Sequence, residues 1–406
     1  MRTFVACAAV AVVLPTCLAA QTVSVTESDL LAQLSRQSPR IQAARAPVDV
    51  ARAGIVAAGR WPNPRVTLNR ESVAGVAEDI VTVSQPLPIT GRRRLERQAA
   101  TALADARSSR ADEEVRRIRA DARLAFADLW AAQERERELV RTHARLTDLA
   151  GVLGKRERAG DTAGFDRMRA EREVLSVDAD RSIAMTARAQ AQVLLATYLA
   201  PDRDTAALEA VRPPAAPAPL PDVEALTSRA EAVRGDLIAL ARDLDAASFA
   251  ERAAGRRAIP EPEVVGGSKT SNAAGGDAGS IVSVHVTLPL FDRGRPERMT
   301  AQAQARQAQA EAAALRQSIR AQIAVWRLAV VERRAAADRH RAALAEGAGQ
   351  IERIAQVSYD AGERGVLELL DAYRTSSTAR LHQVELDAAV REAEIELEFV
   401  SGWEIP

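Results

Sequence analysis

The sequence predicts a mainly α-helical protein with a small β part, made of two tandem copies of one unit. Pro86 and Pro289 are 203 residues apart, and so are Gly91 and Gly294, so similar segments recur in one register. Residues 89–200 and 297–405 contain no proline, which leaves room for long helices. Just before each glycine, apolar and polar residues alternate as they do in strands. A short strand therefore leads into a long helical region in each copy.

The clearest strand signal lies at 280–288, where valines alternate with polar residues. In the first copy, Arg65–Arg70 and Ile80–Gln85 predict a hairpin around Gly75. In the second copy we expect a strand to begin at 263–267, followed by a glycine-rich surface loop at 266–279 and a strand at 281–288. The alternation divides the side chains into two sets. Val282, Val284 and Val286 lie on an apolar side, which would be lipid-facing in a membrane, and Ser283, His285 and Thr287 lie on a polar side, which would then be lumen-facing.

Long helices are expected to fill the proline-free stretches. Apolar residues from Val115 to Leu153 follow alternating steps of three and four, the heptad pattern of a coiled coil. A helix over 91–155 would be about 95 Å long at 1.5 Å per residue. It is followed by a turn near 159–164 and a return helix to Leu199. The second copy predicts helices at 223–257, 296–358 and 366–400, and the first copy begins with two helical pieces within 26–58, interrupted at Pro39 and Pro47.

These patterns divide the chain into four parts. Residues 1–20 resemble a signal peptide, because an apolar run ends in small residues, and an N-terminal membrane anchor is the alternative. Residues 21–200 form the first repeat and 222–406 the second. The proline-rich stretch 201–221 is predicted to be a stiff, extended linker rather than a structural element.

Cysteine occurs only inside the predicted signal segment, at Cys7 and Cys17. The mature chain is therefore expected to lack disulfide and thiol chemistry. Cys17 is a candidate lipidation site, although the preceding Leu14-Pro15-Thr16 is a poor lipobox.

Composition excludes several classes of function. The 55 basic residues balance the 55 acidic residues, so no general field for binding nucleic acid is implied. No set of nucleophile, base and orienting residue is evident, so an enzyme is disfavoured and no catalytic residue or cofactor is assigned. The four histidines are isolated in sequence, and we assign no metal site.

The expected strands impose a constraint. Each copy offers two strands, and their apolar side requires a non-aqueous environment. Within lipid only a closed barrel satisfies the backbone of strands, and about eight strands are the practical minimum. Four strands cannot close alone, so several chains must share one barrel. The helices, which include the run ERERE at 134–138, are too charged for lipid and must lie in water.

The chain resembles the TolC-like outer-membrane efflux proteins over nearly all of its mature length. The resemblance is carried by the two-copy plan and by the order of these motifs along it: Asn63-Pro64, Ser84-Gln85-Pro86-Leu87, Thr90-Gly91-Arg92-Arg93, Leu288-Pro289-Leu290-Phe291-Asp292 with Gly294, Tyr359-Asp360-Ala361-Gly362, and Leu369-Leu370-Asp371-Ala372-Tyr373-Arg374. The first-copy motifs are also similar to the branch that serves heavy-metal cation pumps.

The resemblance implies a homotrimer whose chains share a twelve-stranded transmembrane β-barrel, continued by a trimeric α-barrel in the periplasm. Such a trimer, embedded in outer-membrane lipid, is the exit duct of a tripartite system. Its implied partners are a periplasmic adaptor and an inner-membrane pump of the resistance-nodulation-division type.

The resemblance also suggests sites at the helix-hairpin turns, where charged side chains and glycines gather. The adaptor-contact residues expected there are Gly160, Asp161, Thr162, Gly362, Glu363, Arg364 and Gly365. Glu368, Asp371 and Arg374 are the candidates for a periplasmic gate. Turn chemistry and a solvated helical face are the alternative explanations of these residues.

A periplasmic adaptor that interacts through a coiled coil is the alternative function. Adaptors also contain helical hairpins. They would, however, need β-rich domains flanking one hairpin, rather than strands duplicated within two helical units.

Overall fold

The computed structural model describes residues 23–34, 38–160, 164–199, 205–212 and 219–404. Their contacts divide the chain into two units. Unit 1 comprises the described residues within 1–33, 125–214 and 348–384, and unit 2 those within 34–124, 215–347 and 385–406. The predicted signal peptide, its cysteines and the turn residues Asp161 and Thr162 lie outside the described residues.

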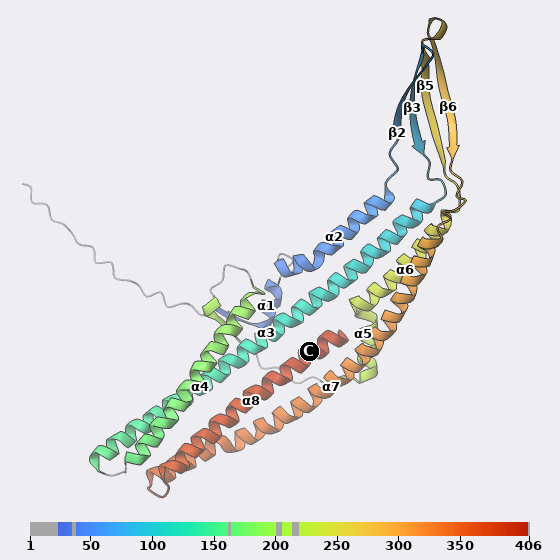
Figure 1. Ribbon diagram of the computed structural model, residues 1–406. Coiled ribbons are helices and arrows are strands. Elements are labelled where there is room, and N and C mark those ends of the chain that lie inside the picture. The colour runs from blue at the N-terminus through green and yellow to red at the C-terminus, as the bar shows by residue number, and fades with distance from the viewer. Residues whose placement is uncertain (1–22, 35–37, 161–163, 200–204, 213–218, 405–406) are drawn as a thin grey trace, which may run out of the picture. The chain divides into compact units, whose positions relative to one another are not determined.

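Eight α-helices occupy the described residues (Figure 1): α1 Glu27–Gln33, α2 Pro39–Gly59, α3 Arg92–Ala159, α4 Gly164–Ala196, α5 Val223–Val233, α6 Gly235–Arg256, α7 Arg295–Asp360 and α8 Val366–Ser401. Short 3₁₀ turns lie at Thr205–Ala207 and Ala273–Gly275. The two helical pieces expected near the N-terminus are confirmed. Pro39 opens α2, where no intrahelical N–H is needed, whereas Pro47 lies inside α2 without ending it.

The helix expected over 223–257 is in fact two helices. The chain leaves helical geometry at Arg234, which is 6% exposed and forms ion pairs with Glu113 and Asp236. Gly235 then begins α6 so close to α3 that an added Cβ would lie 2.3 Å from the Ser109 carbonyl oxygen. The break therefore follows from a close backbone approach, which no local sequence signal reports.

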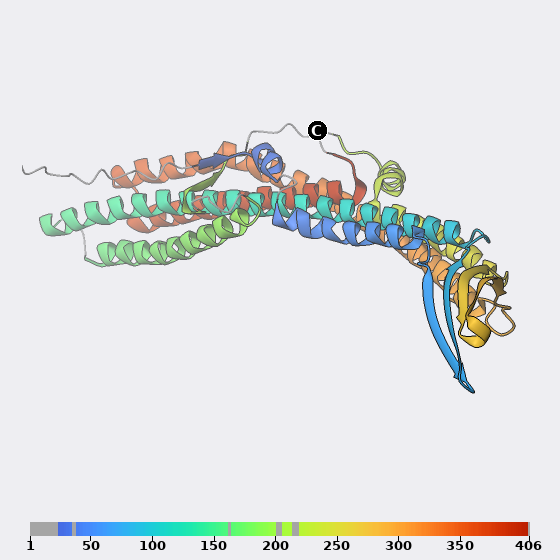
Figure 2. The ribbon, with the colours of Figure 1, turned by 90° about the horizontal axis from the view of Figure 1, so that it is seen from above.

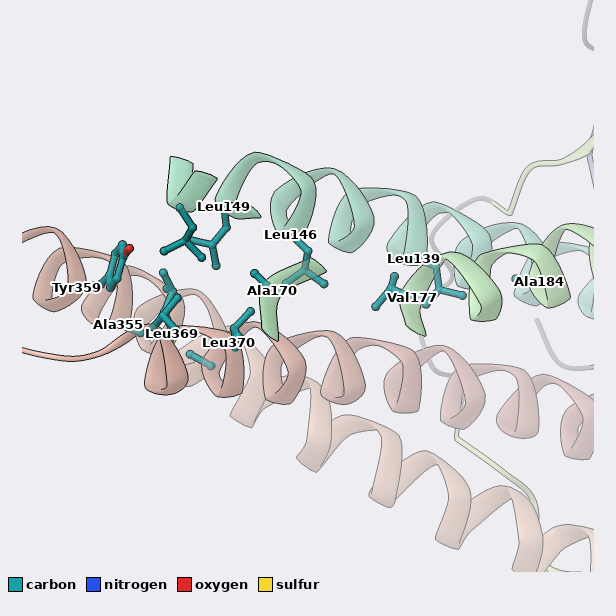
Figure 3. Packing of buried hydrophobic residues seen from close by; sticks show 13 residues of the cluster. Leu139, Leu146, Leu149, Ala170, Val177, Ala184, Ala355, Tyr359, Leu369 and Leu370 are labelled. Atoms are coloured by element: carbon teal, nitrogen blue, oxygen red, sulfur yellow. The ribbon is translucent and has the colours of Figure 1, made fainter. Parts of the chain in front are cut away.

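The part of the expected heptad seam from Leu139 to Leu153 is confirmed in the core of unit 1. Leu139, Leu146 and Leu153 recur every seven residues on α3 and are buried. Ala170, Val177 and Ala184 recur at the same interval on α4 and join the same cluster (Figure 3). The interval matches the 3.5-residue repeat of a coiled coil. Buried residues of α7 and α8 complete the cluster: Ala355, Tyr359, Val366, Leu369, Leu370 and Ala372.

Unit 2 has its own core and an additional helix layer. Leu226 and Ala230 of α5 pack with residues of α7 and α8, including Ile323 and Leu397, which are fully buried. α2 lies along the first part of α3 (Figure 2), and an open apolar groove of about 650 Å³ runs between them.

The strands β2 Arg65–Val73, β3 Val76–Pro86, β5 Pro262–Ser271 and β6 Asp277–Val286 form one antiparallel sheet in that order (Figure 1). The predicted hairpins are confirmed, but the glycine-rich loop at 266–279 is wrong, because most of it is strand. Gly267 explains the difference: an added Cβ would lie 2.2 Å from the Val81 carbonyl oxygen. Glycine here allows β3 and β5 to approach closely.

A second, two-stranded sheet was not expected. β1 Val23–Val25 pairs in parallel with β4 Leu208–Ala210, which lies within the stretch assigned to the linker. Gln192 donates to the carbonyl of Leu208, and the Ala210 amide donates to Gln133. Prolines flank β4 without entering it, so the composition of 201–221 concealed a short paired strand.

Corresponding glycines mark the two repeats. Gly91 and Gly294 precede α3 and α7 with φ of 76° and 72°, and Gly160 and Gly362 follow α3 and α7 with φ of 82° and 75°. Only glycine adopts this left-handed geometry without strain. The duplicated register inferred from the sequence is thus a duplicated backbone geometry.

Where the sheet meets the helices, one carboxylate joins the two repeats. Glu261, just before β5, accepts hydrogen bonds from Thr90 Oγ1 at 2.6 Å and from Arg92 Nη2 at 3.2 Å. Burial raises the pKa of Glu261, but these hydrogen bonds outweigh it, and the pKa lies below its ordinary value of 4.5.

We expect Gly91→Ala and Gly294→Ala to separate backbone strain from crowding. Both substitutions place alanine at the same positive φ, which costs about 1–2 kcal/mol. At Gly91 the added Cβ meets nothing within 4 Å, whereas at Gly294 it would lie 2.2 Å from the Ala254 carbonyl oxygen. Gly294→Ala should therefore lower the stability by a further ~1–3 kcal/mol, measured by thermal unfolding in detergent. Equal losses of stability in the two variants would contradict the close approach of Gly294 to the Ala254 carbonyl oxygen.

A second prediction concerns acid sensitivity. Because the folded pKa of Glu261 is lowered, its stabilising contribution is present above about pH 4.5 and is lost as the pH falls through the folded pKa. Glu261→Gln should cost roughly 1–2 kcal/mol at pH 7 and should lose less further stability than the wild type between pH 5 and pH 3. If the melting temperatures of the wild type and of Glu261→Gln fell by the same amount between pH 5 and pH 3, the Glu261 carboxylate would contribute nothing to the acid sensitivity.

Candidate functional site

One face of the four-stranded sheet is apolar and exposed. The strand pairing places its alternate residues on this face, with Val66 opposite Val83, Leu68 opposite Val81, and Val264 opposite Val284. Val282 is 83% exposed and Leu68 75% exposed. Eight apolar side chains share the face: Val66, Leu68, Val81, Val83, Val264, Val282, Val284 and Val286. An apolar face of this extent requires an apolar partner.

The opposite face is mainly polar. It carries Thr67, Thr82 and Ser283, and an ion pair between Lys269 and Glu78 with an N–O distance of 2.5 Å. His285 lies on this face 3.4 Å from the Ser283 hydroxyl. The strand alternation predicted for residues 282–286 is therefore present, while Thr287 lies just beyond the end of β6.

The sheet has two open edges. β2 pairs only with β3, and β6 pairs only with β5, among the residues that the structure describes. The outer edges of β2 and β6 thus present backbone N–H and C=O groups without strand partners. The strands contain 9, 11, 10 and 10 residues, lengths that match the roughly 9–11 residues of a tilted membrane-spanning strand.

The end of the sheet nearest the helices is built alike in both repeats. After β3, the Ile89 amide donates to the Leu87 carbonyl, and after β6, the Leu290 amide donates to the Leu288 carbonyl, each at 2.9 Å. These tight turns leave several large apolar side chains exposed: Ile89, Leu288, Leu290 and Phe291, together with Trp61 before β2.

The turn between α7 and α8 is a closed hydrogen-bonded structure. The Gly362 amide donates to the Tyr359 carbonyl, and the Glu363 and Arg364 amides donate to the Ser358 carbonyl. Glu363, Arg364 and Gly365 are exposed, whereas Val366 is buried in the unit 1 core. The backbone is therefore fixed while the polar residues of the turn remain accessible. At the other hairpin, Gly160 is described and exposed.

Arg374 forms an ion pair that sequence reasoning did not identify. Its guanidinium binds Glu173 of α4, with the shortest N–O distance 2.6 Å. This pairing, reinforced by the nearby Asp371 charge, raises the pKa of Arg374. Asp371 and Glu368 are exposed on α8, and among the described contacts neither forms a hydrogen bond with Arg374. Arg374 thus links α8 to α4 within the chain.

A buried charge network behind this turn was missed. Glu138, only 3% exposed, accepts from Arg380 of α8, and Glu352 of α7 pairs with both Arg145 and Arg380. Glu352 and Arg145 are separated by 207 residues and Glu138 and Arg380 by 242, so no local spacing could have revealed these pairs. Nearby, burial raises the pKa of Tyr373, whose hydroxyl donates to Gln356 at 2.6 Å.

In the part of the chain that the structure describes, no group of three or more histidine, cysteine, aspartate or glutamate side chains could hold a metal ion. No helix there combines the length and apolar content that crossing a bilayer requires.

Sequence comparison finds relatives among efflux proteins. Residues 226–402 match the family model described as "Outer membrane efflux protein". The chain is 26% identical over 351 residues to the cobalt-zinc-cadmium resistance protein CzcC of Cupriavidus metallidurans, a match that covers 84% of this chain and 81% of that protein.

Solved structures share the fold along most of the chain. A membrane protein from Pseudomonas aeruginosa matches with a TM-score of 0.77 at 20% identity, covering 93% of each chain. CusC, described as forming a transmembrane channel, matches with a TM-score of 0.71 at 17% identity, covering 92% of this chain and 91% of that chain. Residues 226–402 are thus similar to the outer membrane efflux protein family, and the fold along most of the chain is that of these solved structures.

Proposed function

We propose that the chain is one subunit of a channel that conducts substrates passively from an inner-membrane pump across the periplasm and the outer membrane. The observation that carries this proposal is a four-stranded sheet with one exposed apolar face and two open edges. Lipid provides a partner for the apolar face, and further copies of the chain provide partners for the edges. The strands of both repeats form one sheet, which does not fit an adaptor with β-rich domains flanking a single hairpin.

The oligomer is a homotrimer in this proposal. β2 and β6 run in opposite directions, so the free edge of β6 can pair with β2 of the next copy in the antiparallel manner used throughout the sheet. Three copies supply twelve strands, above the practical minimum of about eight. The valine face then meets lipid, and the face with Ser283 and His285 lines the lumen. Thr287 continues the lumen-facing series beyond the strand.

The partners are a periplasmic adaptor and an inner-membrane pump of the resistance-nodulation-division type. The adaptor contacts the two helix-hairpin turns, and in the α7–α8 turn the exposed residues Glu363 and Arg364 lie on a hydrogen-bonded backbone. The substrates are heavy-metal cations, supported by the similarity to a cobalt-zinc-cadmium resistance protein.

The periplasmic entrance is controlled by residues near the α7–α8 turn. Asp371 and Glu368 are exposed acidic side chains on α8, and in a trimer each would occur three times about the axis and attract cations. Arg374 holds the start of α8 to α4 through Glu173, so this ion pair favours one arrangement of the two hairpins. Opening requires it to break or to move.

The proposed assembly predicts covalent oligomers from a double-cysteine variant. The native cysteines lie within 1–20, the predicted signal peptide, so Thr67→Cys on β2 and Ser283→Cys on β6 would be the reactive pair in the mature protein. Both residues lie on the polar face, at opposite edges of the sheet. A short bifunctional maleimide should give dimers and trimers on denaturing gels.

Each single-cysteine variant serves as the control, since it can form at most dimers. A monomer under all conditions in membranes would contradict the proposed oligomer, and with it the channel.

The proposed gate predicts a change in single-channel conductance. Arg374→Ala and Glu173→Gln each remove one side of the same ion pair and should raise the conductance to a similar extent, with the double variant no higher than either. Asp371→Ala should lower the cation selectivity instead. Arg364→Ala, an exposed arginine of the turn, is the control. Unchanged conductance in both pair variants would remove Arg374 from the gate.

A further inference from the structure

Arginine is concentrated where the sheet meets the helices. The segments 60–65, 89–98, 251–263 and 291–298 flank the ends of the strands in unit 2. Together they hold twelve arginines and six carboxylates, although the whole chain has a formal charge of zero. A local excess of positive charge therefore lies beside the apolar sheet face.

Within these segments, most of the acidic side chains form ion pairs, but few of the arginines do. Arg92 pairs with Glu96 and Glu261, and Arg257 pairs with Glu297 and lies 3.8 Å from Asp292. The arginine collar is defined here as nine exposed arginines of these segments for which the described residues provide no ion pair: Arg60, Arg65, Arg94, Arg97, Arg252, Arg256, Arg293, Arg295 and Arg298.

The collar adjoins exposed apolar and aromatic side chains. Phe291 is 99% exposed and lies between Leu290 and the collar residue Arg293. Trp61, next to Arg60, is 57% exposed, and the Arg93 guanidinium lies 4.7 Å from the centre of its ring. A belt of aromatic residues beside cationic side chains is typical of the level at which lipid headgroups lie.

The position of the arginines opposes an ordinary rule of helix stability. α3 begins with Arg92, Arg93 and Arg94 and has no acidic residue in its first turn. Cations near a helix N-terminus interact unfavourably with the helix dipole. Arg92 is compensated by Glu96 and Glu261 and Arg93 by Trp61, but no described ion pair compensates Arg94. A residue that breaks a local rule in this way indicates a functional demand at that place.

The other end of the sheet has the opposite charge balance. Residues near the β2–β3 and β5–β6 turns include four acids and two bases: Glu71, Glu78, Asp79 and Asp277, with Arg70 and Lys269. Arg70 pairs with Asp79, and Lys269 with Glu78. The excess of arginine is therefore specific to the helix-side end.

We propose that the arginine collar binds the headgroup phosphates of anionic phospholipids in the periplasmic leaflet of the outer membrane. Guanidinium groups bind phosphate oxygens through paired hydrogen bonds, and the adjacent apolar side chains suit the acyl chains of the same lipid. The collar would thereby fix the depth of the sheet in the bilayer. This inference rests on the proposed membrane-spanning role of the sheet.

Tryptophan quenching tests the inference, with Trp61 as the reporter. The full-length protein is reconstituted into phosphatidylcholine vesicles that contain a small, equal fraction of brominated phosphatidylglycerol or brominated phosphatidylcholine. Trp61→Phe identifies the part of the quenching that arises at the collar. Wild type should show preferential quenching by the anionic lipid, with an apparent preference of about threefold or more that falls as salt is added.

The variants use four arginines from each of two regions of the same helices. Replacing Arg94, Arg97, Arg295 and Arg298 by glutamine should bring the preference close to unity, and replacing the same four by lysine should retain most of it. The control replaces Arg107, Arg119, Arg306 and Arg316 by glutamine, exposed residues farther along α3 and α7, and should keep the wild-type preference.

The outcomes separate the two proposals. Quenching of Trp61 by both lipids without preference, or an unchanged preference in the collar variant, would overturn the lipid inference while leaving the channel intact. Absence of Trp61 quenching by either lipid would overturn the membrane position of the sheet and the lipid inference together.

Discussion

Backbone hydrogen bonding is the constraint on which the architecture depends. The four-stranded sheet leaves the outer edges of β2 and β6 without strand partners, and it exposes a row of valines on one face. In water, such a sheet would invite uncontrolled strand pairing. Within lipid, unpaired backbone groups cost several kcal/mol each. In the proposed channel, both costs disappear when other copies complete the sheet, so membrane insertion and oligomerisation would have one physical cause.

Charge pairing between the repeats holds the helical part together. In unit 2, Arg117 and Arg123 of α3 bind Glu396 and Glu398 of α8, and in unit 1, Arg380 of α8 binds Glu138 of α3. Removing one partner of a buried pair leaves an uncompensated charge, which costs about 3–5 kcal/mol. The helices therefore tolerate many charges because most buried ones have a partner from the other repeat. Glycine geometry at Gly91, Gly294, Gly160 and Gly362 sets where each helix begins or ends.

Periodic features were predictable from the sequence, and features set by distant contacts were not. The heptad of Leu139, Leu146 and Leu153 predicts a coiled-coil helix, because its period equals that of the helix seam. The alternation of valines in β6 predicts a strand for the same reason, because side chains in a strand alternate between its two faces. Gly267 was misread as loop because its neighbour Val81 is far away in sequence. For the same reason the bond from Arg374 to Glu173 and the break at Arg234 left no local signal. The whole-chain charge likewise concealed the arginine collar, since acids elsewhere balance it.

The parity of the sheet has a consequence for stoichiometry. Because each chain contributes an even number of strands, β6 of one copy would meet β2 of the next in the antiparallel manner in a proposed ring of any size. Strand pairing alone therefore does not count subunits: two, three or four copies would satisfy the same edges. In the proposed channel, the lateral fit of the helices would therefore set the number of subunits, and with it the diameter of the pore within the lipid.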